Sequence, residues 1–225
     1  MQAFTAERFH DRSEAGRVLA GIIARHRYID PLILALPRGG VPVALPVAQA
    51  LHAPLDLLFV RKIGAPEQPE FALAAVVEGE PEEITLNADM AHHMRIPAGW
   101  LEARRAEAHT EIARQRTRYC RGRKQHDLAG RSLIVVDDGI ATGTTLRAAI
   151  AALRRAGPHD ITVAVPVAPP GTIEALRAEV DDVICPLTPR LFQAVGFFYD
   201  DFPQVEDDEV ERLMGEAARI ITSGT

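Results

Sequence analysis

Cysteine is scarce in this chain: among 225 residues only Cys120 and Cys185 occur, far apart and without a CxxC pair. This scarcity excludes a disulfide framework or a zinc site of paired cysteines, and it predicts two free thiols in a reducing compartment. Long apolar runs are missing too, since none approaches the roughly 20 residues that span a bilayer. The N-terminus is polar where a secretory signal would be apolar, so we expect a cytoplasmic protein without a membrane segment.

An excess of positive charge is also absent, because 25 lysines and arginines stand against 31 aspartates and glutamates, a net charge of −6. This balance does not indicate general nucleic-acid binding. The charge is uneven: basic residues gather between positions 104 and 124, and acids crowd the C-terminal end. Two interpretations stay open for these clusters. They are solvated helix faces, or they form a subunit or domain contact or a basic wall near a phosphorylated ligand.

Short apolar runs alternate with helical patterns, in a chain whose length suits one large domain or one domain with an insertion. This alternation predicts an α/β fold with a parallel sheet covered by helices on both faces. Strands are expected at residues 32–36, 55–60, 71–77, 83–86, 132–137, 161–165 and 182–187. Helices are expected at residues 42–51, 145–156, 171–179 and from about 207, with a largely helical segment over 87–123 whose long helix starts at Gly99 or Trp100.

The strongest local signal is the sequence LIVVDDGIATGTT at residues 133–145. A buried strand there delivers Asp137 and Asp138 to its carboxyl end, and a turn of glycines and threonines then opens into a helix. Backbone N–H groups at the helix start, together with threonine hydroxyls, form a nest for a phosphate. The two acids repel a phosphate and suit hydroxyls or a metal instead. The pattern therefore predicts a ligand with a phosphate and a pair of hydroxyls, such as a ribose 5-phosphate.

This stretch resembles the phosphoribosyl pyrophosphate (PRPP) signature of type I phosphoribosyltransferases, which has four apolar residues, two acids and a turn ending in Thr-Gly-Thr-Thr. The resemblance implies a single domain over 1–225 with that family's parallel sheet flanked by helices, a helical insertion at about 87–123 and a C-terminal hood or tail at about 188–225. It implies that Asp137 and Asp138 hold the ribose 2- and 3-hydroxyls. The residues implied to cradle the 5-phosphate are Gly139, Ala141, Thr142, Gly143, Thr144 and Thr145.

A second unusual loop carries Arg38, Gly39 and Gly40 after the first predicted strand. The glycines let backbone amides approach an anion closely, and the arginine adds positive charge. Beside the first motif, this loop resembles the pyrophosphate loop of the family. Arg61 and Lys62 follow another strand and are similar to the basic pair that meets pyrophosphate, although snorkelling surface side chains are the alternative.

The tail segment VGFFYD at residues 195–200 is similar to a segment of 6-oxopurine phosphoribosyltransferases. That resemblance implies that Asp200 meets magnesium pyrophosphate and that Phe197 and Phe198 stack on the base. The alternatives are a surface acid and aromatic side chains that cover a core edge. Ala141 departs from those enzymes, which carry an acid there, and resembles adenine-type enzymes. The base therefore stays open, with a purine weakly favoured.

Together these motifs predict a phosphoribosyltransferase of nucleotide salvage that uses PRPP and Mg²⁺, transfers the phosphoribosyl group to a nitrogenous base and releases pyrophosphate. Arg38, Arg61 and Lys62 would act on the leaving group. The segment at 64–70, or part of the insertion, would close over the site. A regulator that senses PRPP or nucleotides, an enzyme that hydrolyses or phosphorolyses phosphoribosyl compounds, and a homodimeric assembly all remain open.

Overall fold

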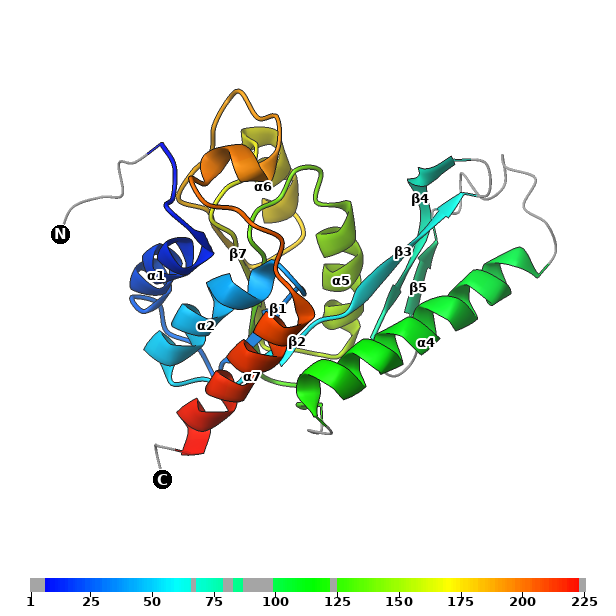
Figure 1. The fold of residues 1–225 in the computed structure, drawn as a ribbon, viewed down its shortest axis with the longest axis horizontal. Coiled ribbons are helices and arrows are strands. Elements are labelled where there is room, and N and C mark those ends of the chain that lie inside the picture. The colour runs from blue at the N-terminus through cyan, green and yellow to red at the C-terminus, as the bar shows by residue number, and fades with distance from the viewer. Residues whose placement is uncertain (1–6, 66–67, 79–82, 87–98, 122–124, 223–225) are drawn as a thin grey trace.

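The structure is a computed structural model that describes residues 7–65, 68–78, 83–86, 99–121 and 125–222. Its strands form two sheets, a five-stranded parallel sheet with the order β2-β1-β6-β7-β8 and a three-stranded antiparallel sheet with the order β3-β4-β5 (Figure 1). The expected α/β fold with a parallel sheet flanked by helices is therefore confirmed. None of the helices in the described ranges is long and apolar enough to cross a membrane.

The parallel sheet places two distant parts of the chain side by side. Its strands are β1 (Leu32–Ala35), β2 (Leu55–Leu57), β6 (Ser132–Val136), β7 (Asp160–Ala164) and β8 (Asp182–Ile184). The central pair, β1 and β6, is buried along its full length and runs in register, with Ala35 opposite Val136. Since ligands of such sheets bind at the carboxyl ends of the strands, the loops that follow these two strands share one edge.

Helices cover both faces of this sheet because its strands are apolar on both sides. They are α1 (Arg12–Ile23), α2 (Gly40–Leu51), α5 (Thr144–Arg155), α6 (Pro170–Arg177) and α7 (Asp207–Thr222). Side chains alternate along β1, so that Ile33 packs with α1, α2 and α7 in one core, while Leu32 and Leu34 pack with α5 and α6 in the other. Burial of these apolar side chains is what holds the helices on the sheet.

The antiparallel sheet and a long helix extend from the parallel sheet (Figure 1). They consist of β3 (Val60–Ala65), β4 (Gln68–Val77), β5 (Glu83–Leu86) and α4 (Trp100–Cys120). α4 packs against β3 and β4 and reaches α7. The long helix expected from Gly99 or Trp100 is thus confirmed, whereas the helical piece expected near 88–94 lies outside the described residues.

Three details of the sequence-based elements were wrong. The strand expected at 55–60 is two strands in different sheets, because Leu58 N–H donates to the Ala35 carbonyl of one sheet and the Phe59 carbonyl accepts from Glu78 N–H of the other. The strands at 71–77 and 83–86 form, but they pair antiparallel, since the link between them is too short for a parallel crossover. Helix α1 was not predicted, although Asp11 caps it by accepting from Glu14 N–H at 2.7 Å.

Candidate active site

The loops after β1 and β6 pack directly against each other. Leu36 N–H donates to the Val136 carbonyl at 2.9 Å, and the Pro37–Arg38 peptide bond that follows is cis. A Cβ atom on Gly40 would lie 2.7 Å from the Val136 oxygen, and one on Gly39 would lie 2.1 Å from Asp138 Oδ2. At Gly40 only glycine fits because two backbones approach closely, and at Gly39 a side chain would meet the Asp138 carboxylate. The two sequence motifs therefore form one structural unit.

A cavity of about 540 Å³ opens beside these loops. Its charged lining comprises Arg38, Arg61, Arg114, Asp137 and Asp207, and residues 58–60 add an apolar wall. Thr145, in the first turn of α5, also lines it. One cavity thus joins Asp137, the first turn of α5 and three guanidinium groups, one of which comes from α4.

The two acids of the first motif differ in their partners. Asp137 lines the cavity and accepts a hydrogen bond from the Asp138 backbone N–H at 2.9 Å. Burial raises the pKa of Asp137 well above its ordinary value, and the neighbouring charge of Asp138 raises it further. Asp138 instead accepts from Arg12 Nε at 2.8 Å; burial raises its pKa, and Arg12 opposes that rise.

Arg12 is a site residue that the sequence analysis missed. It belongs to α1 and is buried, donates to the Pro203 carbonyl at 2.7 Å, and lies over the Phe202 ring with 3.7 Å between the guanidinium carbon and the ring centroid. It therefore ties the acid motif to the N-terminal helix and to the tail. Because Asp138 is 126 positions away along the chain, no local pattern could have revealed the pair.

The turn at residues 139–143 leads from β6 directly into α5, as the motif predicts. Gly143 is the N-cap, so the N–H groups of Thr144 and Thr145 lie in the first turn, where they have no partner within the helix. The Thr142 and Thr144 hydroxyls lie 3.3 Å apart, and the Thr172 hydroxyl donates to the Ala141 carbonyl at 2.8 Å, which ties the turn to α6. A helix N-terminus of this kind suits an anion.

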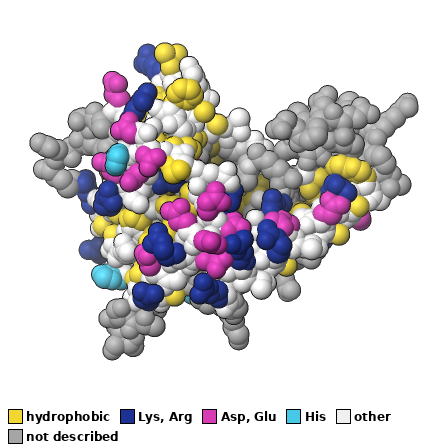
Figure 2. All heavy atoms as spheres, in the orientation of Figure 1, with side chains coloured by type: hydrophobic (Ala, Val, Ile, Leu, Met, Phe, Trp, Pro, Cys, Tyr) yellow, Lys and Arg dark blue, Asp and Glu magenta, His cyan; other side chains and the backbone are white. Residues whose placement is uncertain are grey.

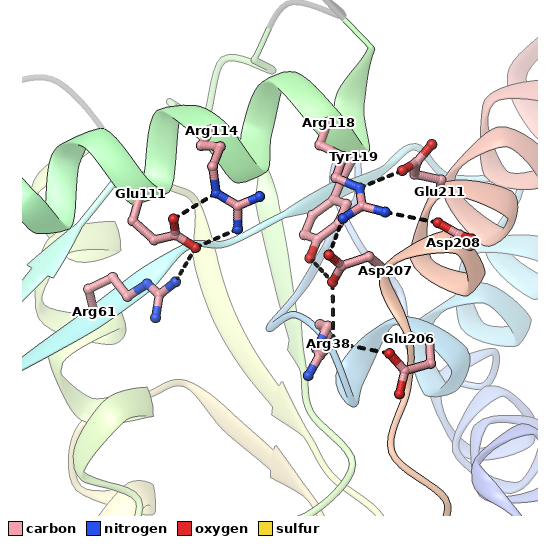
Figure 3. Close-up of polar contacts among 10 residues, drawn as sticks. All are labelled: Arg38, Arg61, Glu111, Arg114, Arg118, Tyr119, Glu206, Asp207, Asp208 and Glu211. Carbon is pink, nitrogen blue, oxygen red and sulfur yellow. Dashed lines mark hydrogen bonds and ion pairs between the residues drawn. The ribbon is translucent and has the colours of Figure 1, made fainter.

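Arg38 is held by the start of α7. Its NH1 group donates to Asp207 Oδ1 at 3.2 Å, and the same oxygen accepts from the Tyr119 hydroxyl of α4 at 2.6 Å (Figure 3). The hydrogen bond from Tyr119 lowers the pKa of Asp207, and the charges of Arg118 and Arg38 lower it further. Asp207 therefore stays ionised and links the pyrophosphate-type loop to both α4 and α7.

The basic and acidic clusters of the sequence face each other across α4 and α7. Arg118 of α4 pairs with Asp207, with Asp208 at 2.8 Å and with Glu211 at 2.7 Å, and Arg121 pairs with Glu211 at 3.2 Å. Figure 2 shows acidic and basic side chains interleaved over this face. Part of each cluster thus forms a contact between two helices of this chain, which the sequence analysis did not consider.

Arg61 makes a second arginine–carboxylate contact at the cavity. Its NH2 group donates to Glu111 of α4 at 2.8 Å, and Glu111 also accepts two hydrogen bonds from Arg114 (Figure 3). Lys62 stands next in β3 with its backbone opposite Ala75, while its side chain lies outside the described set.

Comparison with known proteins agrees with this arrangement. The sequence model of the phosphoribosyl transferase domain family matches residues 6–200. The chain belongs to this family. The crystal structure of TT1426 from Thermus thermophilus matches with a TM-score of 0.80 and 41% identity, over 93% of this chain and 98% of that one.

Relatives known from sequence match to different extents. Rv0571c of Mycobacterium tuberculosis, whose name describes a candidate phosphoribosyl transferase, is 42% identical over 211 residues, which are 94% of this chain and 47% of the relative. This chain therefore spans about half the length of the curated relatives it matches. A uracil phosphoribosyltransferase of Kineococcus radiotolerans is 40% identical over 72 residues, 32% of this chain and 34% of that protein.

The tail packs beside the acid motif. The 3₁₀ turn Val195–Phe198 lies against Gly139, where a Cβ atom would meet Val195 at 2.6 Å, and the Tyr199 hydroxyl donates to the Asp138 carbonyl at 2.6 Å. Phe198 packs on Phe192 with ring centroids 5.3 Å apart. Phe197 is 56% exposed, and neither Phe197 nor Phe198 is among the described residues that line the cavity.

Asp200, the predicted metal-side acid, is exposed, and its backbone N–H donates to the Phe9 carbonyl at 2.9 Å. It is not among the described residues that line the cavity. Within the described ranges, no group of three or more His, Cys, Asp or Glu side chains could hold a metal ion. The role of Asp200 stays a prediction.

We predict opposite stability effects for the two acids. Because the pKa of Asp137 is raised in the folded state, its charge destabilises the fold as the pH rises above the ordinary carboxyl value of about 4. Asp137→Asn removes that charge and keeps an oxygen for the Asp138 N–H, so it should raise the Tm at neutral pH. Asp138→Asn also removes a carboxylate whose pKa is raised by burial, but it leaves the buried Arg12 guanidinium without its charged partner, and that larger loss should lower the Tm by several degrees. Calorimetric melting checks both, and equal losses in the two variants would contradict the assignment.

A second prediction concerns acid and the α4–α7 contact. Since the pKa of Asp207 is lowered, the stability it contributes is complete above the ordinary carboxyl pKa of about 4 and is lost as the pH falls below it. Urea unfolding over this range should show a steeper loss for the wild type than for Arg118→Gln. Arg212→Gln, which removes an exposed pair within α7, is the control and should follow the wild type. Parallel curves for all three proteins would rule out the contribution.

Proposed function

We propose that the protein binds PRPP in the cavity, transfers the phosphoribosyl group to a nitrogenous base and releases pyrophosphate. The observation that carries this proposal is that one cavity is lined by Asp137, by Thr145 of the phosphate turn and by three arginines. PRPP has the matching groups in one molecule: a 5-phosphate, vicinal ribose hydroxyls and a pyrophosphate. The family membership of the chain agrees with this ligand.

Each end of PRPP suits a different part of the site. The 5-phosphate is proposed to lie at the N-terminus of α5, within the predicted cradle Gly139, Ala141, Thr142, Gly143, Thr144 and Thr145. Carboxylates accept hydrogen bonds from ribose hydroxyls, which is the role proposed for Asp137 and Asp138. The pyrophosphate would lie against Arg38, Gly39, Gly40, Arg61 and Lys62, although the Gly40 N–H already donates to the Leu36 carbonyl at 3.0 Å.

Leaving-group stabilisation is the chemistry that these residues supply. As the bond between ribose C1 and the pyrophosphate oxygen breaks, negative charge grows on the pyrophosphate and positive charge on the sugar. Guanidinium groups held in place before the reaction neutralise the first charge without reorganising. Binding both phosphate ends of the substrate also fixes C1 relative to the acceptor. Asp137 and Asp138 orient the ribose in this scheme.

Mg²⁺ fits the donor set as an ion carried by the substrate. This ion binds through one or two carboxylates together with substrate phosphates and water, rather than in an all-protein cage. Of the two acids in the motif, Asp137 lines the cavity and Asp138 is held by Arg12. Asp137 is therefore the carboxylate of the motif that would bind the ion. Mg²⁺ would offset the charge of the pyrophosphate, and Asp200 stays the proposed second acid although it is not among the described residues that line the cavity.

The acceptor is proposed to bind under the hood, against the exposed ring of Phe197. Phe198 packs on Phe192 and so would support the hood beside the base. Ala141 puts a methyl group where the 6-oxopurine enzymes carry an acid, which removes the partner for a protonated ring nitrogen. We therefore propose a purine recognised mainly by stacking, in a reaction of nucleotide salvage.

The alternative of a nucleic-acid-binding regulator loses part of its support in the structure. Arg114, Arg116, Arg118 and Arg121, all from the basic cluster, are paired with carboxylates of the chain itself. Paired arginines have less charge to offer to a phosphate backbone. Turnover is the measurement that separates a regulator from an enzyme.

The direct test incubates the protein with PRPP, Mg²⁺ and a panel of purine and pyrimidine bases, and measures pyrophosphate release and product identity. We expect a nucleoside monophosphate with one class of base. Ribose 5-phosphate formed without a base, or ribose 1-phosphate compounds formed with inorganic phosphate, would instead indicate hydrolysis or phosphorolysis. No turnover with PRPP binding intact would indicate a sensor.

A binding test addresses the ribose site. The double variant Asp137→Asn with Asp138→Asn should weaken PRPP binding on the order of 100-fold or more, because two charge-assisted hydrogen-bond acceptors are lost. The control replaces Asp181 and Asp182 with asparagine. These adjacent acids lie at the amino end of β8, away from the carboxyl ends of the strands where the cavity opens. Calorimetry should show wild-type affinity for this control. A double variant at 137 and 138 that binds PRPP as tightly as the wild type would refute the placement of the ribose.

A further inference from the structure

The helix α4 contributes a side chain to the cavity that neither sequence motif includes. Arg114 lines the cavity together with Arg38 and Arg61, and its neighbour Gln115 does so as well. Arg114 belongs to the basic cluster of the sequence, whose interpretation as a wall near a phosphorylated ligand was left open. Its position now allows that interpretation to be argued residue by residue.

Arg61 and Arg114 converge on one carboxylate. Arg61 NH2 donates to Glu111 Oε1 at 2.8 Å, and Arg114 donates to the same oxygen from NH2 at 2.8 Å and to Oε2 from Nε at 2.7 Å (Figure 3). Two guanidinium groups that share one acceptor oxygen are close enough to bind one anion together. The three groups together carry a charge of +1, so the cluster retains an attraction for a more highly charged anion.

These contacts contribute little to the stability of the fold, so replacing them with contacts to a ligand costs little free energy. The side chains of Arg114, Arg61 and Glu111 are 56%, 40% and 33% exposed, and exposed ion pairs stabilise proteins by about 1 kcal/mol or less. α4 is anchored elsewhere, through the buried side chains of Ile112 and Tyr119. The pairing with Arg114 lowers the pKa of Glu111, so the carboxylate remains an anion near neutral pH.

We propose that Arg114 binds the pyrophosphate group together with Arg61, and that Glu111 is the internal anion that holds both arginines until the ligand arrives. This inference rests on the proposed function, which places pyrophosphate in the cavity. A pyrophosphate offers more acceptor oxygens and more negative charge than a carboxylate, and guanidinium groups bind phosphate oxygens through paired hydrogen bonds. Arg61 and Arg114 therefore turn from Glu111 to the ligand, and the inserted helix forms one wall of the leaving-group pocket.

The same helix carries a matched control for this proposal. Arg104 pairs with Glu107 at the same spacing of three residues as Glu111 and Arg114. The Arg104–Glu107 pair is also exposed, but neither residue is among the described residues that line the cavity. In each pair a substitution removes an exposed arginine–carboxylate contact of the same helix, and of the four residues only Arg114 is among the described residues that line the cavity.

The test measures calorimetric binding of inorganic pyrophosphate and of ribose 5-phosphate to the whole chain. Arg114→Gln should weaken pyrophosphate binding about 10-fold, since charge-assisted hydrogen bonds are lost, and should leave ribose 5-phosphate binding unchanged. Arg104→Gln should leave both affinities within about twofold of the wild type, as expected for a screened surface charge. Glu111→Gln removes the competing anion and should strengthen pyrophosphate binding, whereas Glu107→Gln should not.

Three outcomes would overturn the inference. First, Arg114→Gln could have the same pyrophosphate affinity as Arg104→Gln. Second, Arg114→Gln could weaken the binding of ribose 5-phosphate as much as that of pyrophosphate, which would indicate a general electrostatic effect rather than a direct contact. Third, Glu111→Gln could weaken pyrophosphate binding, which would make Glu111 a positioning residue for the arginines. Suppose that one of these three outcomes is found while the wild type binds PRPP and the Asp137/Asp138 double variant does not. The outcome then overturns this inference and leaves the proposed function intact. A wild type that binds neither PRPP nor pyrophosphate defeats the proposed function as well.

Discussion

The structure depends on the in-register pairing of β1 with β6. This pairing brings the carboxyl ends of both strands to the same edge of the sheet, where Leu36 N–H donates to the Val136 carbonyl. Two loops far apart in sequence therefore meet. Their approach leaves no room for a Cβ atom at Gly39 or Gly40. The glycines are therefore needed for packing between the loops. The common edge then brings carboxylates and arginines into one cavity.

Charge compensation follows from this crowding. Buried acids of like charge repel each other, and Arg12 offsets part of that cost at Asp138, while the burial of Asp137 keeps its pKa raised. On the other side of the cavity, Arg38 is paired with Asp207 and Arg61 with Glu111. In the free protein these arginines are thus paired with carboxylates of the chain itself, which come from α4 and α7.

Local signals were sufficient for part of the account. The acid motif and its threonine turn predicted a strand, a tight turn and a helix, because buried β-branched residues and a glycine cap act over a few positions. The long helix from Trp100 followed from its spacing. Contacts across long sequence separations were beyond such signals: Arg12 meets Asp138, and Arg118 meets Asp207, only after the sheet and helices have packed. The separation of β3 from β2 was missed because the break at Leu58 and Phe59 lies within one continuous apolar run, and it depends on partners in two sheets.

The central claim is that the loops after β1 and β6 bind opposite ends of one molecule. The most direct measurement is a crystal structure of the protein with Mg²⁺ and a non-reactive carbocyclic analogue of PRPP. The account predicts the 5-phosphate at the turn formed by residues 139–145, the ring hydroxyls at Asp137 and Asp138, and the pyrophosphate against Arg38. An analogue that occupies only one of the two loops, or that reverses its ends between them, would contradict the account.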